Sequence, residues 1–148
     1  MKICGIICEY NPFHNGHAFL IEQAKKKSDC DAIVCVMSGN FTQRGELAIL
    51  DKYTRAEHAI RAGADAVIEL PAVYAVAPAE IFASGAIKLL NSLPDFEKLA
   101  FGSESGDENL FRSAADILLR EPKGFKQRLY AQLRTGKSLT LAKFESLE

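Results

Sequence analysis

The sequence has no excess charge of either sign and no long apolar run. It carries 18 Lys and Arg against 19 Asp and Glu, for a net charge of −1, whereas a protein that binds a polyanion over a wide surface usually shows a basic excess. No apolar run approaches the ~20 residues that cross a bilayer, and the N-terminus enters a strand-like segment without a signal-type region. We therefore expect a cytoplasmic protein with no membrane partner.

Cysteine is scarce as well. The chain has Cys4, Cys8, Cys30 and Cys35, which make no disulfide framework in a protein of this size and match no four-ligand zinc spacing. We expect ordinary reduced thiols and no metal site made by protein side chains. With 148 residues, of which 48% are hydrophobic, the chain is long enough for one well-buried core.

Strand-like and helix-like segments alternate over the first two thirds of the chain. Short apolar runs that end in turn residues predict strands, and helical periodicity between them predicts helices. The expected strands span residues 3–8, 31–37, 66–70 and 98–101, and the expected helices span 16–27, 52–62 and 79–90. This order favours an α/β fold with a parallel sheet and helices on both faces. Ligands then bind at the carboxyl ends of the strands, where we expect the loops of His14, Asn40 and Gly102 to converge.

The pattern after Asp107 is helical, with a break at Pro122 and an expected interhelical turn at residues 136–138. We therefore expect an α/β core over residues 1–106 and a helical segment over residues 107–148.

The most informative segment is the turn after the first strand, at residues 9–17. Asn11-Pro12 ends the strand because proline cannot continue a ladder, and a helix follows with Asn15 as its expected N-cap. His14 and His17 are three residues apart, so both imidazoles face the same way near the helix start. Unpaired backbone N–H groups and the positive end of the helix dipole attract an anion there. The segment predicts a phosphate site.

Gly16, between the two histidines, allows a backbone to lie close against a ribose or a phosphate. Such a site suits attack at phosphorus, where a protein mainly positions the reactants and offsets charge. Two plainer interpretations stay open. The histidines hydrogen-bond the loop, or they form half of a zinc site, which the cysteine positions disfavour.

Four segments carry a resemblance to a known family. They are GIICEYNPFHNGH at 5–17, MSGNFTQRGE at 37–46, GADAVIELP at 63–71 and FGSE at 101–104. The first contains the His-x-Gly-His signature of the nucleotidyltransferase superfamily. The series as a whole resembles the tRNA(Met) cytidine acetate ligase family over essentially all 148 residues.

The resemblance implies a Rossmann-like fold of the nucleotidyltransferase and class I synthetase type, and a ligase that converts ATP to AMP and diphosphate, of which this chain alone is expected to be catalytically incomplete. In that family ATP activates acetate as acetyl-adenylate, and the acetyl group passes to the wobble cytidine of elongator tRNA(Met), giving N4-acetylcytidine. The implied cofactor is ATP with Mg²⁺ supplied on the nucleotide, and the implied partners are acetate and the tRNA. Family members are longer, so the chain is expected to be an N-terminal portion that leads into a further C-terminal part. Most RNA contacts are expected to lie outside this chain.

The resemblance also implies site residues. His14 and His17 are the implied catalytic pair at the phosphates. The implied ATP-binding residues are Ile6, Ile7, Cys8, Glu9, Tyr10, Asn11, Pro12, Phe13, His14, Asn15, Gly16, His17, Ala18, Phe19, Leu20 and Gly102. From the residues alone, Asn40, Gln43 and Arg44 form a candidate substrate loop, since arginine suits bidentate recognition of a carboxylate or phosphate. A purely structural loop is the alternative.

Two other function classes stay open. One is a small-molecule adenylyltransferase or cytidylyltransferase that releases pyrophosphate, and the other is a nucleotide-binding module without catalysis. The first three loops are poor in cations, which favours a small acceptor over a phosphorylated one. Nearby, Asp51, Tyr53, Arg55 and His58 are expected to be cap, packing and surface residues, and Glu69 to satisfy a loop amide. The sequence predicts no oligomeric state.

Overall fold

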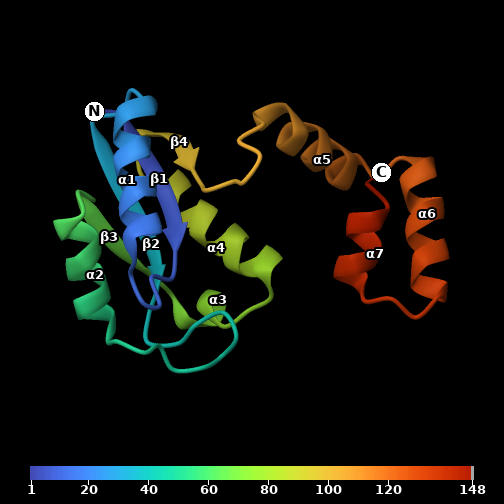
Figure 1. Cartoon of the computed structure of the whole chain (residues 1–148), viewed down its shortest axis with the longest axis horizontal. Coiled ribbons are helices and arrows are strands. Elements are labelled where there is room, and N and C mark those ends of the chain that lie inside the picture. Colours follow the sequence, from blue (N-terminus) through green and yellow to red (C-terminus); the bar gives the residue numbers. More distant parts are fainter. Residues whose placement is uncertain (148) are drawn as a thin grey trace. The chain divides into compact units, whose positions relative to one another are not determined.

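The computed structural model describes residues 1–147 (Figure 1). The chain divides into two compact units, Met1–Gly102 and a helical unit that begins at Ser103. Every strand of the described residues lies in the first unit.

The first unit is built on a four-stranded parallel sheet, as the alternating pattern predicts. The strands are β1 (Ile3–Cys8), β2 (Ala32–Ser38), β3 (Ala66–Leu70) and β4 (Phe96–Ala100). Their order is β3-β2-β1-β4, so β1 and β2 form the central, buried pair. β4 begins earlier than the predicted Lys98, because Phe96 packs against the core and pairs with Ile3 before a register shift.

Four helices cover the sheet. They are α1 (Asn15–Lys27), α2 (Lys52–Arg61), α3 (Ala72–Ala75) and α4 (Ala79–Asn91). α1 and α2 pack on one face, and α3 and α4 pack on the other (Figure 1). Since successive strand residues point to opposite faces, Ile33 and Cys35 join the first core, whereas Val34 and Val36 join the second.

Helix boundaries follow the capping residues that the sequence contains. The Asp51 carboxylate accepts hydrogen bonds from the backbone N–H groups of Tyr53 (2.9 Å) and Thr54 (3.1 Å) at the start of α2. Gly63 follows the end of α2 with φ 109°, in the left-handed region that glycine adopts after a helix. α4 begins directly after Pro78. All three boundaries agree with the sequence-based prediction.

The absence of a side chain at Gly5 allows α4 to lie close to β1. An ideal Cβ at Gly5 would lie 2.6 Å from Cδ1 of Leu90 and 3.0 Å from Cε2 of Phe96. Leu90 is fully buried, so it has little room to move away. The close approach of helix and strand therefore requires glycine at this position.

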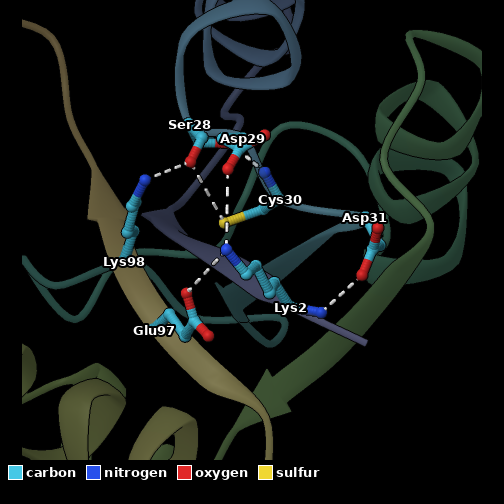
Figure 2. Close-up of polar contacts among 7 residues, drawn as sticks. All are labelled: Lys2, Ser28, Asp29, Cys30, Asp31, Glu97 and Lys98. Carbon is cyan, nitrogen blue, oxygen red and sulfur yellow. Dashed lines mark hydrogen bonds and ion pairs between the residues drawn. The ribbon is translucent and has the colours of Figure 1, made fainter.

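A network of polar contacts connects segments at the amino ends of the strands (Figure 2). The backbone N–H of Lys2 donates to Asp31 Oδ2 at 2.7 Å, and Lys2 Nζ lies 3.9 Å from Glu97 Oε2. Lys98 Nζ donates to the carbonyl oxygen of Ser28. These contacts join β1, β4 and the loop between α1 and β2. Because the strands are parallel, the opposite, carboxyl edge is where the connecting loops meet and where a ligand is expected.

The helical unit contains α5 (Glu108–Arg120), α6 (Lys123–Arg134) and α7 (Leu139–Glu145). Its buried core is formed by Phe125, Leu129 and Ala142. Pro122 separates α5 from α6, and Gly136, with φ 84°, lies in the turn between α6 and α7, as predicted. None of the helices within residues 1–147 has the length and apolar character to cross a membrane.

Candidate functional site

The two histidines lie at the start of α1, and the first of them is itself the N-cap. His14 has an extended backbone (φ −145°, ψ 173°), and its Nδ1 accepts a hydrogen bond from the Gly16 backbone N–H at 3.1 Å. The prediction of Asn15 as the cap is wrong, because Asn15 is the first residue of the helix. An imidazole nitrogen here takes the place of the oxygen that Ser, Thr, Asp or Asn usually provides.

His17 completes a reciprocal capping box. Its Nδ1 accepts a hydrogen bond from the His14 backbone N–H at 3.2 Å, and its own backbone N–H donates to the His14 carbonyl oxygen at 2.9 Å. The two rings are stacked, with centroids 3.6 Å apart and planes 24° from parallel. The spacing of three residues therefore brings both imidazoles together, as predicted.

The capping box determines which ring nitrogen carries the proton. Both Nδ1 atoms accept hydrogen bonds from backbone N–H groups, so each neutral imidazole is protonated on Nε2. Each Nε2–H is then a donor directed away from the helix backbone. A proton on Nδ1 of His17 would oppose the His14 N–H, so the capping box favours the neutral form of His17.

The His17 ring packs against two aromatic side chains. Its ring centroid lies 4.9 Å from that of Tyr10 and 5.5 Å from that of Phe13. Tyr10 is 1% exposed and has φ 49°, and its hydroxyl lies 3.3 Å from Cys35 Sγ. Burial, together with the neighbouring His14, lowers the pKa of His17. The two aromatic rings therefore pack against the His17 ring, and its surroundings favour the neutral form.

A pocket of about 610 Å³ opens beside the two imidazoles, within the range of roughly 300–1,000 Å³ typical of small-molecule sites. It lies at the carboxyl end of β1, which has β2 on one side and β4 on the other. The strand order reverses at β1, and ligands of such sheets bind where the order reverses. Of the predicted ATP-binding residues, those in its lining are Ile7, Cys8, Glu9, Tyr10, Asn11, Pro12, His14 and His17.

The other predicted ATP-binding residues lie outside this lining. They are Ile6, Phe13, Asn15, Gly16, Ala18, Phe19, Leu20 and Gly102. Ile6 and Leu20 belong to the core between α1 and the sheet, so they support the site from below. Gly102 follows β4 at the same sheet edge, and a Cβ added there would have no atom within 4 Å. Its predicted approach to the nucleotide stays a prediction.

The space beside Gly16 is occupied by His14. An ideal Cβ at Gly16 would lie 3.0 Å from Cε1 and 3.1 Å from Nδ1 of the His14 ring. From the sequence alone, the missing side chain is expected to allow close approach of a ligand. In the structure it first allows the His14 ring to fold back over Gly16 and reach its amide.

The loop between β2 and α2 forms a small hairpin, residues 41–47, beside the pocket. Phe41 and Leu47 pair as an antiparallel bridge, and the Thr42 N–H donates to the Glu46 carbonyl oxygen at 2.9 Å. The hairpin residues in the pocket lining are Thr42, Arg44 and Glu46. Arg44 is the one Lys or Arg in that lining, so it supplies the cationic side chain of the pocket.

Asn40 and Gln43, which the sequence grouped with Arg44, do not line the pocket. Asn40 Oδ1 accepts a hydrogen bond from the Lys52 backbone N–H at 3.4 Å, at the start of α2. The Gln43 backbone N–H donates to Glu9 Oε1 at 2.8 Å. Both residues therefore connect loops, and Arg44 alone of the three faces the pocket.

Sequence reasoning missed three lining residues, Thr42, Glu46 and Phe82. Thr42 and Glu46 face each other across the hairpin, and residues 43–45 form its turn, so no alternation along the sequence indicates their place in the lining. Phe82 comes from α4, on the other face of the sheet from α1, and no local pattern indicates its place. Sequence reasoning also did not predict that Arg55 is wholly buried.

Glu69 does not satisfy a loop amide, so that prediction is wrong. Its Oε2 accepts a hydrogen bond from Lys52 Nζ at 2.6 Å, because the start of α2 brings a cation to the end of β3. His58 packs near the Phe13 ring, with centroids 6.3 Å apart. These residues support the loops around the pocket and lie outside its lining.

The arrangement suits an anionic ligand that reacts without a covalent protein intermediate. The N-terminus of α1, two Nε2–H donors and the Arg44 guanidinium offer positive potential to the pocket, and the Glu9 and Glu46 carboxylates in the same lining oppose it. Cys8 is the one thiol in the lining, and burial raises its pKa, which leaves it a poor nucleophile. The site is therefore built to bind and stabilise charge on a phosphate.

Known proteins agree with this geometry. The family model for HIGH nucleotidyl transferases matches residues 1–148. The tRNA(Met) cytidine acetate ligase of Caldanaerobacter subterraneus subsp. tengcongensis is 54% identical over 147 residues, which cover 99% of this chain and 36% of that protein. The protein of the same name from Acetivibrio thermocellus is 49% identical over 148 residues, or 100% of this chain and 36% of that protein.

The fold is also similar to solved structures. The crystal structure of Thermotoga maritima TmcAL bound with alpha-thio ATP matches with a TM-score of 0.90 and 44% identity, covering 99% of this chain and 36% of that one. The apo form of the same protein matches with a TM-score of 0.89. This chain thus spans little more than a third of the length of these relatives. By its sequence over residues 1–148, its parallel sheet and its paired histidines, the chain belongs to the HIGH nucleotidyl transferase family.

Proposed function

We propose that this chain supplies the ATP-binding, adenylate-forming site of a tRNA(Met) cytidine acetate ligase. An acetate oxygen attacks the α-phosphorus of ATP, the bond to pyrophosphate breaks, and acetyl-adenylate forms. The exocyclic amine of the wobble cytidine of elongator tRNA(Met) then attacks the acetyl carbonyl, AMP leaves, and the amine loses a proton to give N4-acetylcytidine. The names of the relatives support the overall reaction.

The stacked imidazoles at the start of α1 are the observation that carries the proposal. His14 and His17 present Nε2–H donors beside the positive end of the helix. Donors held in place before the reaction stabilise the charge that develops on the α-phosphate and on the departing pyrophosphate. The pocket volume of about 610 Å³ suits a nucleotide, and Mg²⁺ carried by the nucleotide offsets the remaining phosphate charge. Gly102, at the same sheet edge, is the proposed contact with the rest of the nucleotide.

Arg44 is the proposed ligand of the acetate carboxylate. A guanidinium binds a carboxylate through two parallel hydrogen bonds. Arg44 is the one Lys or Arg in a lining that also holds the Glu9 and Glu46 carboxylates, so the pocket has little net positive charge, whereas a phosphorylated acceptor requires further Lys or Arg at the pocket mouth. The lining therefore favours acetate over the phosphorylated metabolites that a small-molecule nucleotidyltransferase uses.

The tRNA is proposed to bind mainly through parts of the relatives that this chain does not match. A net charge of −1 gives little counterion release and so little affinity for a polyanion. The matched segment is 36% of the Caldanaerobacter protein, which leaves ample length for RNA contacts in such a ligase.

The test is exchange of labelled pyrophosphate into ATP with candidate acceptors. Acetate should promote exchange by a protein extended to the length of the relatives, and glycerol 3-phosphate, as a phosphorylated control, should not. A His14→Ala, His17→Ala double variant that still binds ATP is the matched control. Exchange with the phosphorylated acceptor alone would indicate a small-molecule nucleotidyltransferase, and ATP binding without exchange would indicate a non-catalytic module.

A further inference from the structure

Arg55, on α2, connects the loops that follow β1 and β2. Its side chain is 0% exposed. Its Nε donates to the Leu50 carbonyl oxygen at 3.0 Å, and one terminal nitrogen donates to the Glu9 carbonyl oxygen at 2.5 Å. The other terminal nitrogen donates to the carbonyl oxygen of Gly39. One guanidinium therefore spans the ends of the two central strands.

The partners of Arg55 are unusual for a buried cation. All three are neutral carbonyl groups, and no residue in the described part of the chain forms an ion pair with it. Arg61, on the same helix, instead pairs on the surface with Glu57 at 2.5 Å. The carboxylates of Glu9, Asp51 and Glu69 attract the guanidinium only from beyond ion-pair distance, and burial of a charge without a paired carboxylate is costly. What only arginine offers is a rigid fork that holds several carbonyl groups at once.

Two side chains of the β1–α1 loop make a second set of links. Glu9 Oε1 accepts a hydrogen bond from the Gln43 N–H at 2.8 Å, and Asn11 Oδ1 accepts one from the Ile49 N–H at 2.7 Å. The first bond holds the turn of the hairpin, next to Arg44, and the second holds the chain two residues after the hairpin. Glu9 and Asn11 also line the pocket. The β1–α1 loop therefore both lines the pocket and holds the hairpin in place.

We propose that Arg55 is a positioning residue which, with Glu9 and Asn11, fixes the Arg44 hairpin relative to His14 and His17. It thereby sets where the carboxylate acceptor meets the α-phosphate. The proposal rests on the proposed function, because it assigns Arg44 to the acceptor. Since a misplacement of about 1 Å in a reacting pair costs about a hundredfold in rate, a residue that sets this distance acts on the reaction without touching the substrates.

The first test measures the link itself and does not depend on the acceptor. In the parent protein, saturating ATP should slow amide hydrogen exchange at Gln43 and Ile49, because their acceptors belong to the loop that the nucleotide orders. Arg55→Lys should reduce this ATP-dependent protection about tenfold, and Arg61→Lys, the control on the same helix, should leave it unchanged. Equal protection in Arg55→Lys and the parent would overturn the proposal. If Arg55→Lys does not fold, Asn11→Ala should reduce the ATP-dependent protection at Gln43 as well, although its acceptor Glu9 is intact, and unchanged protection at Gln43 would overturn the proposal.

The second test asks whether the link acts through Arg44. Arg55→Lys should raise the KM for acetate about tenfold with less than about twofold change in the KM for ATP. In an Arg44→Ala background the same substitution should have no further effect on the acetate KM, because the two residues act as one unit. Additive effects would overturn the role through Arg44. Parent protein that shows ATP-dependent protection but no acetate-dependent exchange would refute the proposed function and leave the link standing.

Discussion

Replacing His14 by Ala and by Asn separates the capping role that the structure shows from the chemical role that we propose. His14 caps α1 through Nδ1 and presents Nε2–H to the pocket. Loss of an N-cap side chain costs about 0.5–2 kcal/mol, and 1 kcal/mol shifts the melting temperature of a domain of 60–100 residues by about 4–8 °C. His14→Ala should therefore melt several degrees below the parent. His14→Asn should melt close to it, because Asn is among the best N-caps.

Both variants lose the Nε2–H donor, so both should lose activity alike. Removal of one donor that stabilises a transition-state oxyanion costs about 10²–10³ in rate. We expect acetate-dependent pyrophosphate exchange to fall about 10²-fold or more in each variant, with a smaller loss of ATP affinity in calorimetry. Parental exchange in His14→Asn would refute the chemical role of His14, and a large loss of thermal stability in the same variant would refute its role as a cap.

Three further predictions use single substitutions. Gly16→Ala gains about 1 kcal/mol of helix propensity but displaces the His14 ring. Its melting temperature should therefore stay near that of the parent, whereas its ATP affinity in calorimetry should fall. Equal ATP affinity in variant and parent would refute this role of Gly16. Gly5→Ala meets buried Leu90 and should lower the free energy of unfolding in urea by about 1–3 kcal/mol, with ATP affinity unchanged; an unchanged midpoint would show that α4 shifts freely. The pKa of His17 is lowered, so the folded state binds the His17 proton more weakly than the unfolded state does. The stability that neutral His17 contributes is therefore fully present above about pH 6.5, the pKa of an unperturbed histidine. It is lost as the pH falls through the folded pKa, and His17→Gln should show a shallower loss of stability over that acidic range than the parent.

The elements of the sheet could be predicted because their signals are local. Short apolar runs ended by turn residues gave β1, β2 and β3 within a residue or so, and Asp51 and Gly63 marked both ends of α2. The start of β4 was displaced because Phe96 belongs to it through packing on Ile3 and the core. Neither contact is indicated by the spacing of apolar residues in this segment.

The candidate site was predictable only where spacing along the chain decides the contact. His14 and His17 stack because they are three residues apart at a helix start. In contrast, Glu9 meets Gln43 across 34 positions of sequence, and the buried Arg55 has partners from three separate places in the chain. Such long-range polar contacts depend on how the loops after β1 and β2 pack together at the carboxyl ends of the strands. No local sequence pattern indicates this packing. Histidine as an N-cap escaped prediction for another reason, because propensities favour Asn at the neighbouring position.

Nucleotide binding is expected to reside in the first unit alone. The pocket lining runs from Ile7 to Phe82, and both cores of the sheet lie between Ile3 and Ala100, whereas the helical unit has a core of its own around Phe125. A chain of residues 1–106 should therefore fold and bind ATP with a Kd within about twofold of that of the whole chain, a difference under about 0.5 kcal/mol. Calorimetry on both chains measures this directly. A Kd more than about tenfold weaker, or about 1.4 kcal/mol, in a folded 1–106 chain would mean that residues beyond Gly106 contribute to the nucleotide site.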